Sequence, residues 1–376
     1  MKEEITIANG YYMHRALMLA KKGLRKTSPN PMVGCVIVKY DRIIGEGWHH
    51  EYGQAHAEIE ALNDAKNHNE DVRGSTVYVT LEPCSHFGKT PPCAQRLVSE
   101  GVARVVYAMT DPNPKVNGQG LQILREAGIE VKQTTQGYMN QAKFLNRGFV
   151  FVHKYNRPFI TLKAAMSLDG KMNLANNSSK WITGIESRTQ AHKLRSQNDA
   201  VLVGVNTILH DDPQLTVRHV EGIDPLRVIL DSQLRTPINA KAIANDNKCL
   251  ILTSETADEK KFIALQNAGA RVARIKTVNN HIDIKSALDY LVTQNILTLM
   301  IEGGPEVLSS FLREKFADYV NLFIAPKIFG EGRGFDLNLN FDSVSEAFDV
   351  DIPKSKIKRL GDDIFIEGWL SCSQDL

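Results

Sequence analysis

The sequence predicts an α/β protein built from two consecutive units, each a sheet covered by helices. Apolar runs rich in β-branched residues alternate with helical stretches along most of the 376 residues. This alternation ends near residue 150 and begins again with an apolar run over 159–166, directly after Pro158. A chain of this length also suggests two or three domains. We therefore expect one domain over residues 1–149 and a second over 155–376.

The first unit is expected to be a three-layer α/β/α domain. Its opening helix is amphipathic, with Met13, Ala16 and Leu17 on one face. Pro83 should end the third strand, and Cys84 can begin a following helix, whose exposed amides would favour a thiolate. The expected elements, in order, are a helix over 11–22, strands over 33–38 and 43–47 joined by a turn at Tyr40-Asp41, a helix over 55–66, and strands over 75–81, 104–108 and 129–132.

The second unit is expected to be a doubly wound α/β sheet, because strands and helices alternate after a link at 149–156. Its final segments, 319–328 and 357–370, lack an intervening long helix, so we expect antiparallel strands there. The other strands are predicted at 159–166, 200–204, 227–231, 249–253, 271–274 and 297–302, and the helices at 187–196, 257–268, 284–293 and 306–313.

Three residues of the first unit form a pattern typical of a catalytic zinc site. His56 offers one imidazole, and Cys84 and Cys93 offer two thiolates. Three such ligands leave the fourth tetrahedral position for a water, whose pKa zinc lowers toward neutrality. Glu58 is not needed as a ligand and can shuttle the proton. This order of residues, with Pro83 before the first cysteine, predicts a zinc-dependent deaminase of an aminopyrimidine or purine.

The two cysteines are further apart than in the common form of this motif. Eight residues separate Cys84 from Cys93, whereas the usual spacing is two. The insert contains Lys89 and Thr90, and a substrate that carries a phosphate would explain a loop with these residues. Lys89 could equally be a solvated surface charge. Asn30 lies between two prolines in an irregular loop, where its amide could contact a base or sugar or simply belong to a turn.

Motifs along nearly the whole chain resemble the bifunctional deaminase–reductase family of riboflavin biosynthesis. In the first unit the resemblance is carried by 30–35 (NPMVGC), 56–58 (HAE), 80–93 (TLEPCSHFGKTPPC) and 111–114 (DPNP). In the second unit it is carried by 168–171 (LDGK), 181–183 (WIT), 211–218 (DDPQLTVR), 231–232 (DS) and 302–305 (EGGP). These motifs recur in the family's order across both units, which makes the resemblance specific.

The resemblance implies a fold and an activity for each unit. It implies a cytidine-deaminase-like first domain that uses Zn²⁺ to deaminate a ribosylaminopyrimidine phosphate. It also implies a dihydrofolate-reductase-like second domain that reduces the ribosyl group to ribityl with NADPH. Asn30, Lys89 and Thr90 would then contact the substrate of the deaminase.

The residues alone indicate the second site only weakly. The turn at 302–305 has two glycines between a strand and a helix, so its amides could hold a pyrophosphate or form a plain turn. Lys163 and Asp169 are expected near the same cleft, and Arg195 or Arg218 could bind a substrate phosphate or remain solvated. The resemblance assigns substrate contacts to Ser179, Arg195, Leu215, Arg218 and Glu302. It assigns cofactor contacts to Ala165, Trp181, Thr207, Asp211, Ser232, Gly304, Pro305, Glu306, Val307, Leu308, Ser309 and Ser310.

Composition and charge argue against several other classes of protein. The chain has 43% hydrophobic and 23% charged residues and a formal net charge of +2, so neither nucleic acid nor a membrane surface is indicated as a partner. Its start is charged, and no apolar run resembles a signal peptide or a membrane span. Five scattered cysteines, two of them assigned to zinc, favour a reducing cytoplasm. We expect a homo-oligomer that binds a small phosphorylated pyrimidine.

Two other functions stay open at this point. A zinc deaminase could act on another nucleoside or on a nucleic-acid base, with a second domain of unrelated function. Editing of single strands would need a basic groove with aromatic side chains, but the chain has 7% aromatic residues and no basic cluster. Alternatively, His56 and the two cysteines could form a structural zinc site if His49, His50 or His86 supplied a fourth ligand.

Overall fold

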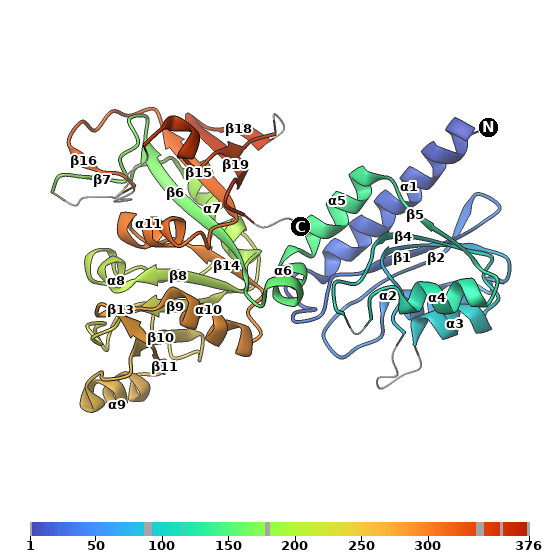
Figure 1. Ribbon diagram of the computed structural model, residues 1–376, viewed down its shortest axis with the longest axis horizontal. Helices are drawn as coiled ribbons and strands as arrows, with labels where there is room; N and C mark the ends of the chain where they lie inside the picture. Colours follow the sequence, from blue (N-terminus) through green and yellow to red (C-terminus); the bar gives the residue numbers. More distant parts are fainter. Residues whose placement is uncertain are drawn as a thin grey trace. The chain divides into compact units, whose positions relative to one another are not determined.

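The computed structural model describes residues 2–85, 92–114, 116–176, 181–335, 342–353 and 356–373. The chain divides into two compact units, Met1–Asn156 and Arg157–Asp375 (Figure 1). Each unit has its own sheet and its own buried clusters.

The first unit is built on a five-stranded sheet. Its strands are β1 (Gly34–Lys39), β2 (Arg42–Trp48), β3 (Thr76–Leu81), β4 (Arg104–Met109) and β5 (Glu130–Gln133), in the order β2-β1-β3-β4-β5. Strand β1 pairs antiparallel with β2 and β3, whereas β3, β4 and β5 are parallel to one another. Tyr40 and Asp41 join β1 to β2 with φ angles of 50° and 55°, which suit a tight hairpin turn.

Helices cover both faces of this sheet, as the predicted three-layer arrangement requires (Figure 1). The helices are α1 (Lys2–Ala20), α2 (Ala57–Asn67), α3 (Cys93–Ser99), α4 (Gln119–Glu126), α5 (Gln136–Leu145) and α6 (Arg147–Tyr155). One buried cluster joins α2, α3 and α4 to one face, and another joins α1, α5 and α6 to the opposite face. Strand β1 serves both, because Cys35 and Ile37 belong to the first cluster and Val36 and Val38 to the second.

Two glycines of β2 allow α2 to approach the sheet closely. A Cβ atom at Gly45 would lie 2.4 Å from the carbonyl oxygen of Ala61, and one at Gly47 would lie 2.4 Å from that of Ala57. Because neither approach leaves room for a side chain, any larger residue would push the helix away from the strand. The absence of both side chains therefore fixes the N-terminal half of α2 over β2.

Four features of the first unit differ from the sequence predictions. Helix α3 begins at Cys93 and not at Cys84, because Pro92 forms a non-helical N-cap with a ψ of 141°. The segment expected as a link is mostly helix α6, whose Val150 and Phe151 are buried. Helix α5 was not predicted, and α1 begins well before the expected residue 11.

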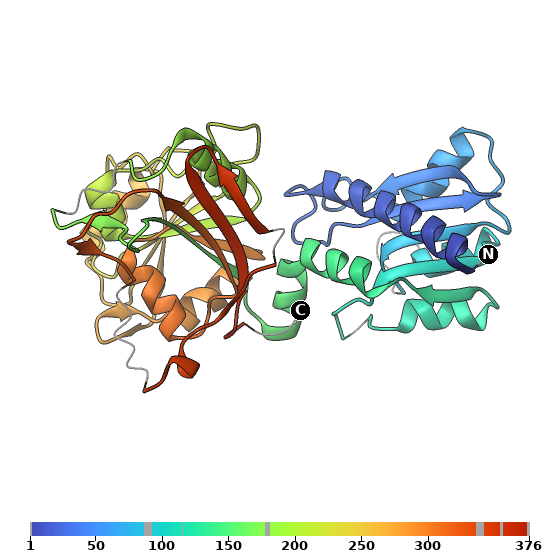
Figure 2. The same ribbon diagram turned by 90° about the horizontal axis from the view of Figure 1, so that it is seen from above.

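The second unit contains a larger sheet with the order β11-β10-β9-β8-β14-β6-β15-β19-β17, and β18 also pairs with β19. Its strands are β6 (Phe159–Ser167), β8 (Ala200–Gly204), β9 (Leu226–Leu230), β10 (Cys249–Ser254), β11 (Arg271–Ile275), β14 (Thr298–Ile301), β15 (Tyr319–Ala325), β17 (Val350–Asp351), β18 (Ile357–Leu360) and β19 (Asp363–Leu370). All neighbours from β11 to β15 are parallel, whereas β19 is antiparallel to β15. The expected antiparallel arrangement of the final segments is confirmed, because β19 pairs antiparallel with both β15 and β18, while β15 is parallel to its other neighbour β6. The last strands, drawn in red, lie together in Figures 1 and 2.

Helices on both sides make this sheet doubly wound, as predicted. They are α7 (Ile185–Ser196), α8 (Val205–Asp211), α9 (Glu259–Asn267), α10 (Ile284–Thr293) and α11 (Pro305–Arg313), of which only α8 was not expected. One buried cluster joins α10 and α11 to the sheet, and a second cluster includes residues of α7, α8 and α9. The unit also contains two short antiparallel pairs: the hairpin of β12 (Thr277–Val278) with β13 (His281–Ile282), and the long-range pair of β7 (Asn173–Leu174) with β16 (Gly332–Arg333).

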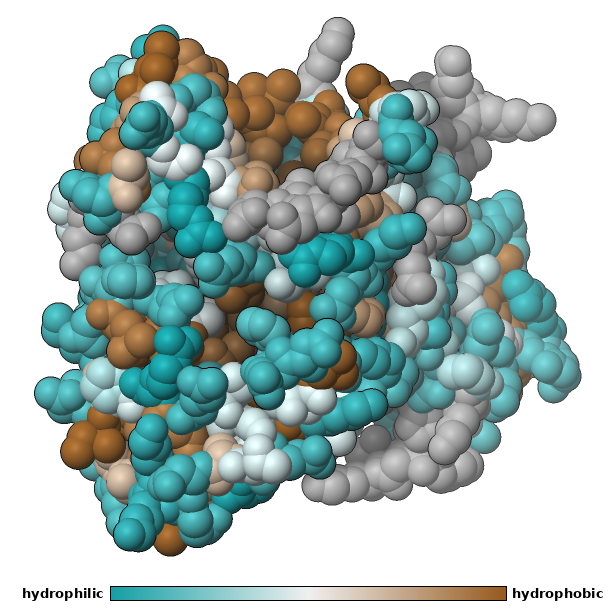
Figure 3. Space-filling view, turned by 60° about the vertical axis from the view of Figure 1, so that its left-hand side comes forward, coloured by the Kyte–Doolittle hydropathy of each residue, from teal (hydrophilic) through white to brown (hydrophobic). Residues whose placement is uncertain are grey.

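No helix in the described ranges is both long enough and apolar enough to cross a bilayer. On the face shown in Figure 3, hydrophilic side chains surround several apolar patches. Exposed apolar side chains of the second unit include Leu168, Trp181 and Ile328, which are 62%, 69% and 77% exposed.

A buried ion pair ties the start of the second unit to the residue before β15. Arg157 donates two hydrogen bonds to the carboxylate of Asp318, at 2.7 and 2.6 Å, and the two side chains are 6% and 0% exposed. The same carboxylate accepts from the backbone N–H of Ile160 at 2.9 Å and from the Ser373 hydroxyl at 3.1 Å. Burial raises the pKa of Asp318, and Arg157 opposes this shift. The carboxylate therefore depends on its arginine to stay ionised.

Replacing Arg157 by Leu should lower the free energy of unfolding of the second unit by about 3–5 kcal/mol, because Asp318 would remain buried without its partner. Denaturant unfolding of the full chain measures this effect. Lys285→Ala is the matched control, since it breaks an exposed pair with Asp289, and it should cost less than about 1 kcal/mol. Similar small losses in both variants would show that the buried pair is not a major source of stability.

Candidate active sites

The predicted metal ligands of the first unit lie together. His56 immediately precedes α2, Cys84 follows β3, and Cys93 begins α3. The Nδ1 atom of His56 is 3.5 Å from the Sγ of Cys84 and 3.3 Å from the Sγ of Cys93. In a tetrahedral zinc site, nitrogen and sulfur ligands at normal bond lengths lie roughly 3.5 Å apart. The three donor atoms are thus arranged as zinc requires.

The electrostatic state of these residues also suits a metal. Hydrogen bonds with Cys93 and His56 lower the pKa of Cys84 to about 4, although burial opposes the shift. Cys84 is therefore a thiolate at neutral pH, which is the form that binds zinc. The backbone N–H of Cys93 donates to the same sulfur at 3.2 Å, so the start of α3 helps to stabilise the negative charge.

Glu58 lies beside the three ligands without belonging to them. It is the second residue of α2 and is 3% exposed. Burial raises the pKa of its carboxyl to about 7, while His56 acts in the opposite direction. A carboxyl group with a pKa near neutrality can both accept and return a proton, as a shuttle must.

A fourth protein ligand is absent from the described residues. The metal-ligand cluster found there consists of His56, Cys84 and Cys93 alone. His49 forms hydrogen bonds through both ring nitrogens, and the His50 ring lies 4.0 Å from a carboxylate oxygen of Glu60. An open fourth position is the mark of a catalytic zinc site. His86 lies outside the described residues.

The predicted substrate contacts of the first unit are only partly within the described structure. Asn30 is half-buried, and its amide lies 3.3 Å from the Nε2 of His49. Lys89 and Thr90 lie outside the described residues, as does Ser179 of the second unit.

In the second unit, three charged side chains meet at the carboxyl end of β14. Glu302 accepts two hydrogen bonds from Arg195, at 2.8 and 2.9 Å, and lies 3.8 Å from the Nζ of Lys163. Burial would raise the pKa of Glu302, but Arg195 and Lys163 outweigh it and hold the value at about 2. Open parallel sheets bind ligands at this edge, outside the carboxyl ends of their strands.

The other predicted substrate residues lie in the segment after α8. Arg218 is exposed, and one of its terminal nitrogens contacts Gln214 and Thr216 at 2.7 and 3.3 Å. Its backbone N–H donates to the Nδ1 of His192 at 3.1 Å. Leu215 has a φ of +56° and belongs to a buried cluster, so its backbone and not its side chain can meet a ligand.

The predicted cofactor turn forms the N-terminus of α11. Gly304 precedes the helix and Pro305 begins it, which leaves the first amides of the helix without partners inside it. The side chain of Val307 packs directly against two glycines. A Cβ atom at Gly204 would lie 2.8 Å from a side-chain carbon of Val307, and one at Gly303 would lie 2.7 Å from another. Glu306 pairs with Arg333 at 3.1 Å, Ser310 is partly exposed, and Leu308 and Ser309 are buried with 1% and 0% exposure.

The remaining predicted cofactor residues are spread along the same edge of the sheet. Ala165 is on β6, Thr207 and Asp211 are on α8, and Ser232 follows β9. Trp181 is largely exposed, and the guanidinium of Arg188 lies 4.6 Å from its ring centroid.

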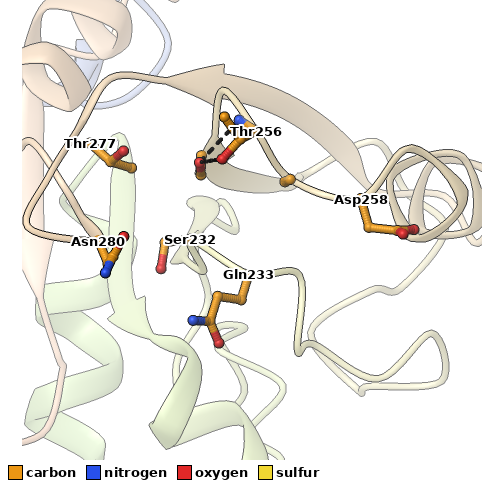
Figure 4. Close-up of a pocket in the computed structure, with 8 residues that line it drawn as sticks. Ser232, Gln233, Thr256, Asp258, Thr277 and Asn280 are labelled. Atoms are coloured by element: carbon orange, nitrogen blue, oxygen red, sulfur yellow. Dashed lines mark hydrogen bonds between the residues drawn. The ribbon is translucent and has the colours of Figure 1, made fainter.

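A polar cavity of about 280 Å³ surrounds Ser232 (Figure 4). Figure 4 shows Ser232 and Gln233 on one side and Thr277 and Asn280 on another. Its full lining is Ser232, Gln233, Ser254, Thr256, Ala257, Asp258, Thr277 and Asn280. Hydroxyl and amide groups dominate this lining, so it suits a ligand rich in hydroxyl or phosphate oxygens.

Sequence reasoning did not assign several residues that these sites contain. His49 was considered only as a possible metal ligand, yet it is 3% exposed and adjoins His56. His192 is also buried, and burial together with Arg195 and Arg218 lowers its pKa to about 4. A histidine directly after a predicted strand was the one available signal for His49.

Comparisons with known proteins match each of the two units to a known domain. Residues 7–109 match the cytidine and deoxycytidylate deaminase zinc-binding region, and residues 158–366 match the RibD C-terminal domain. The riboflavin biosynthesis protein RibD of Aquifex aeolicus is 45% identical over 356 residues, which cover 94% of this chain and 96% of that protein. The Escherichia coli protein of the same name is 38% identical over 365 residues, or 93% and 95% of the two chains.

Two crystal structures resemble the whole chain. A diaminohydroxyphosphoribosylaminopyrimidine deaminase/5-amino-6-(5-phosphoribosylamino)uracil reductase from Thermotoga maritima has a TM-score of 0.86 at 36% identity, covering 97% of this chain and 99% of its own. RibD of Acinetobacter baumannii has a TM-score of 0.85 at 37% identity with the same coverage.

The two matched regions define a bifunctional enzyme, in which a zinc deaminase domain precedes a reductase domain. Zinc and NADPH are the cofactors of these domains. The chain belongs to the RibD family of riboflavin biosynthesis.

Cys84→Ser should remove zinc and abolish deamination, because a serine hydroxyl is a poor replacement for a thiolate ligand. Metal analysis of the purified chain checks this, with one zinc per chain expected before the change. Cys249→Ser is the control, since that buried cysteine is in the second unit and should leave the zinc content unchanged. Full zinc occupancy after replacing both Cys84 and Cys93 would contradict the assignment.

Glu58→Gln should retain zinc but lower the rate of deamination by about 10²–10⁴-fold or more, because it removes a general acid–base group and keeps the ligands. Zinc content and ammonia release are measured on the same preparation. Loss of zinc from this variant would mean instead that Glu58 is itself a ligand.

Proposed function

We propose that the chain catalyses two successive steps on one phosphorylated pyrimidine. The first unit hydrolyses the 2-amino group of 2,5-diamino-6-ribosylamino-4-pyrimidinone 5′-phosphate, and the second reduces the ribosyl group of the product to ribityl with NADPH. The observation that carries this proposal is the set of His56, Cys84 and Cys93 beside Glu58 in a chain that also contains the Glu302–Arg195 cleft. The resemblance of the whole chain to deaminase–reductases supports it.

In the deaminase step, water replaces an amino group on the ring and ammonia leaves. Zinc, when bound, supplies a water that is easily deprotonated. Glu58 would accept a proton from the attacking water and return it to the departing nitrogen, which balances the reaction. Asn30 would contact the substrate beside the metal, with Lys89 and Thr90 as further contacts.

In the reductase step, the charged groups of the cleft divide into two kinds. Arg195 is already bonded to Glu302 and to the carbonyl oxygen of Thr216, so it chiefly fixes that carboxylate. Arg218 is exposed, and among the described residues its side chain hydrogen-bonds only to the neutral Gln214 and Thr216, which makes it the better ligand for the substrate phosphate. Ser179, the Leu215 backbone and Glu302 would complete the substrate site.

NADPH would lie along the carboxyl edge of the parallel strands. The N-terminus of α11, at Gly304 to Ser310, suits the pyrophosphate, and the cavity around Ser232 suits the hydroxylated adenosine end. Ala165, Trp181, Thr207 and Asp211 would complete the cofactor site.

We also propose that this enzyme is a cytoplasmic homo-oligomer whose deaminase and reductase domains are residues 1–149 and 155–376. All five cysteines are unpaired in the structure, which supports a reducing compartment. The division into two compact units supports the assignment of one activity to each.

Two assays on the full chain test the proposed function. Incubation of the diaminopyrimidine substrate with the zinc-loaded chain should release ammonia, and a chelator should stop this release. Addition of NADPH should then give oxidation of the cofactor that depends on the deaminated product. Ammonia release without subsequent NADPH oxidation would exclude the second half of the proposal.

Arg218→Ala should lower kcat/KM of the reductase for the phosphorylated substrate by about tenfold to a hundredfold, because it removes a charge-assisted hydrogen bond. The affinity for NADPH should barely change, and Arg218→Lys should restore only part of the loss. Arg359→Ala is the control, since Arg359 is exposed on β18 and pairs only loosely with Asp362. If Arg218→Ala weakened NADPH binding and left the KM for the pyrimidine unchanged, Arg218 would belong to the cofactor site and not to the substrate site.

A further inference from the structure

A buried histidine adjoins the metal ligands of the first unit without being one of them. His49 immediately follows β2, is 3% exposed, and packs edge-to-face on His56 with the ring centroids 5.6 Å apart. Its backbone N–H donates to the carbonyl oxygen of Val33 at 2.9 Å. The position of the imidazole is therefore fixed by the sheet.

The hydrogen bonds of His49 define which ring nitrogen carries the proton. Nδ1 lies 3.0 Å from the carbonyl oxygen of Ala55, which can only accept, so the hydrogen is on Nδ1. In the neutral ring Nε2 is then an acceptor, and the Nδ2 of Asn30 lies 3.3 Å from it. The amide of Asn30 thus donates to His49 through its nitrogen.

The loop that carries Asn30 is anchored on both sides of it. The backbone N–H of Asn30 donates to the carbonyl oxygen of Thr27 at 2.8 Å. The buried side chain of Asn146 exchanges two hydrogen bonds with the backbone of Met32, at 2.7 and 2.9 Å. With the loop fixed and the amide nitrogen engaged, no described residue donates a hydrogen bond to the Oδ1 of Asn30.

We propose that His49 is a positioning residue that fixes the polarity of Asn30, so that its carbonyl oxygen accepts a hydrogen bond from an N–H or O–H group of the substrate. This inference rests on the proposed function, which places the pyrimidine substrate at Asn30. An amide that was free to rotate could present either end to the ligand. With His49 in place, a ligand that has no hydrogen-bond donor at this point leaves the Oδ1 of Asn30 without a partner. A ligand that presents an acceptor there is repelled by the same oxygen.

A double-mutant cycle on the zinc-loaded full chain tests this role. His49→Leu and Asn30→Ala, alone and together, are compared by kcat and KM for ammonia release. Each single change should lower kcat/KM by about 5- to 100-fold, as expected for one lost or misdirected hydrogen bond, chiefly through KM. In the Asn30→Ala background, His49→Leu should cost less than about twofold more, because its effect passes through Asn30.

His49→Gln separates this role from a merely structural one. The glutamine carbonyl can accept from Asn30, so this variant should recover most of the kcat/KM that His49→Leu loses, and all variants should keep one zinc per chain. Zinc loss from His49→Leu, an undiminished effect of His49→Leu in the Asn30→Ala background, or full activity of Asn30→Ala would each overturn the inference. Failure of the unaltered zinc-loaded chain to release ammonia would defeat the proposed function, and this inference with it.

Discussion

The first unit depends on one geometric requirement, the convergence of three donor atoms from three separate segments. His56, Cys84 and Cys93 lie before a helix, after a strand and at the start of another helix, and their donor atoms lie within 4.8 Å of one another. The glycines of β2 set the position of α2. Glu82, which is buried next to the first cysteine, accepts hydrogen bonds from three backbone N–H groups between 111 and 120, at 2.9 to 3.3 Å. These backbone constraints hold the three ligand segments in the positions that bring their donor atoms together.

The second unit organises its site in a different way. Its parallel strands end at a common edge, so residues far apart in sequence become neighbours without any dedicated ligand segment. Glu302 follows β14, Lys163 comes from the adjacent β6, and Arg195 comes from a helix, yet all three form one charged cluster. The site therefore depends on strand order, whereas the zinc site depends on local spacing.

This difference explains what the sequence could predict. The zinc ligands and Glu58 could be found because the chemistry demands particular residue types at recognisable spacings. The interaction of His49 with Asn30 could not be found, because nothing in the pattern places the end of β2 beside that loop. Helix α6 was missed because its neighbouring buried residues Val150 and Phe151 resemble a short apolar run more than a helical period. The lining of the cavity around Ser232 comes from several separate segments, and only tertiary structure brings them together.

The cluster at Glu302 has an unbalanced charge. One carboxylate faces the two cations Arg195 and Lys163, and all three side chains are mostly shielded from water. Arg218 and Asp224 also act on this cluster, which leaves three cations against two carboxylates, so an entering anion would neutralise the remaining positive charge. A phosphorylated ligand would act as the counterion of this cluster. Because it would bind the folded state and not the unfolded one, its binding should raise the free energy of unfolding of the second unit. The second unit should thus be more resistant to unfolding in the presence of its substrate or product than in its absence, and unphosphorylated pyrimidines should give less of this protection.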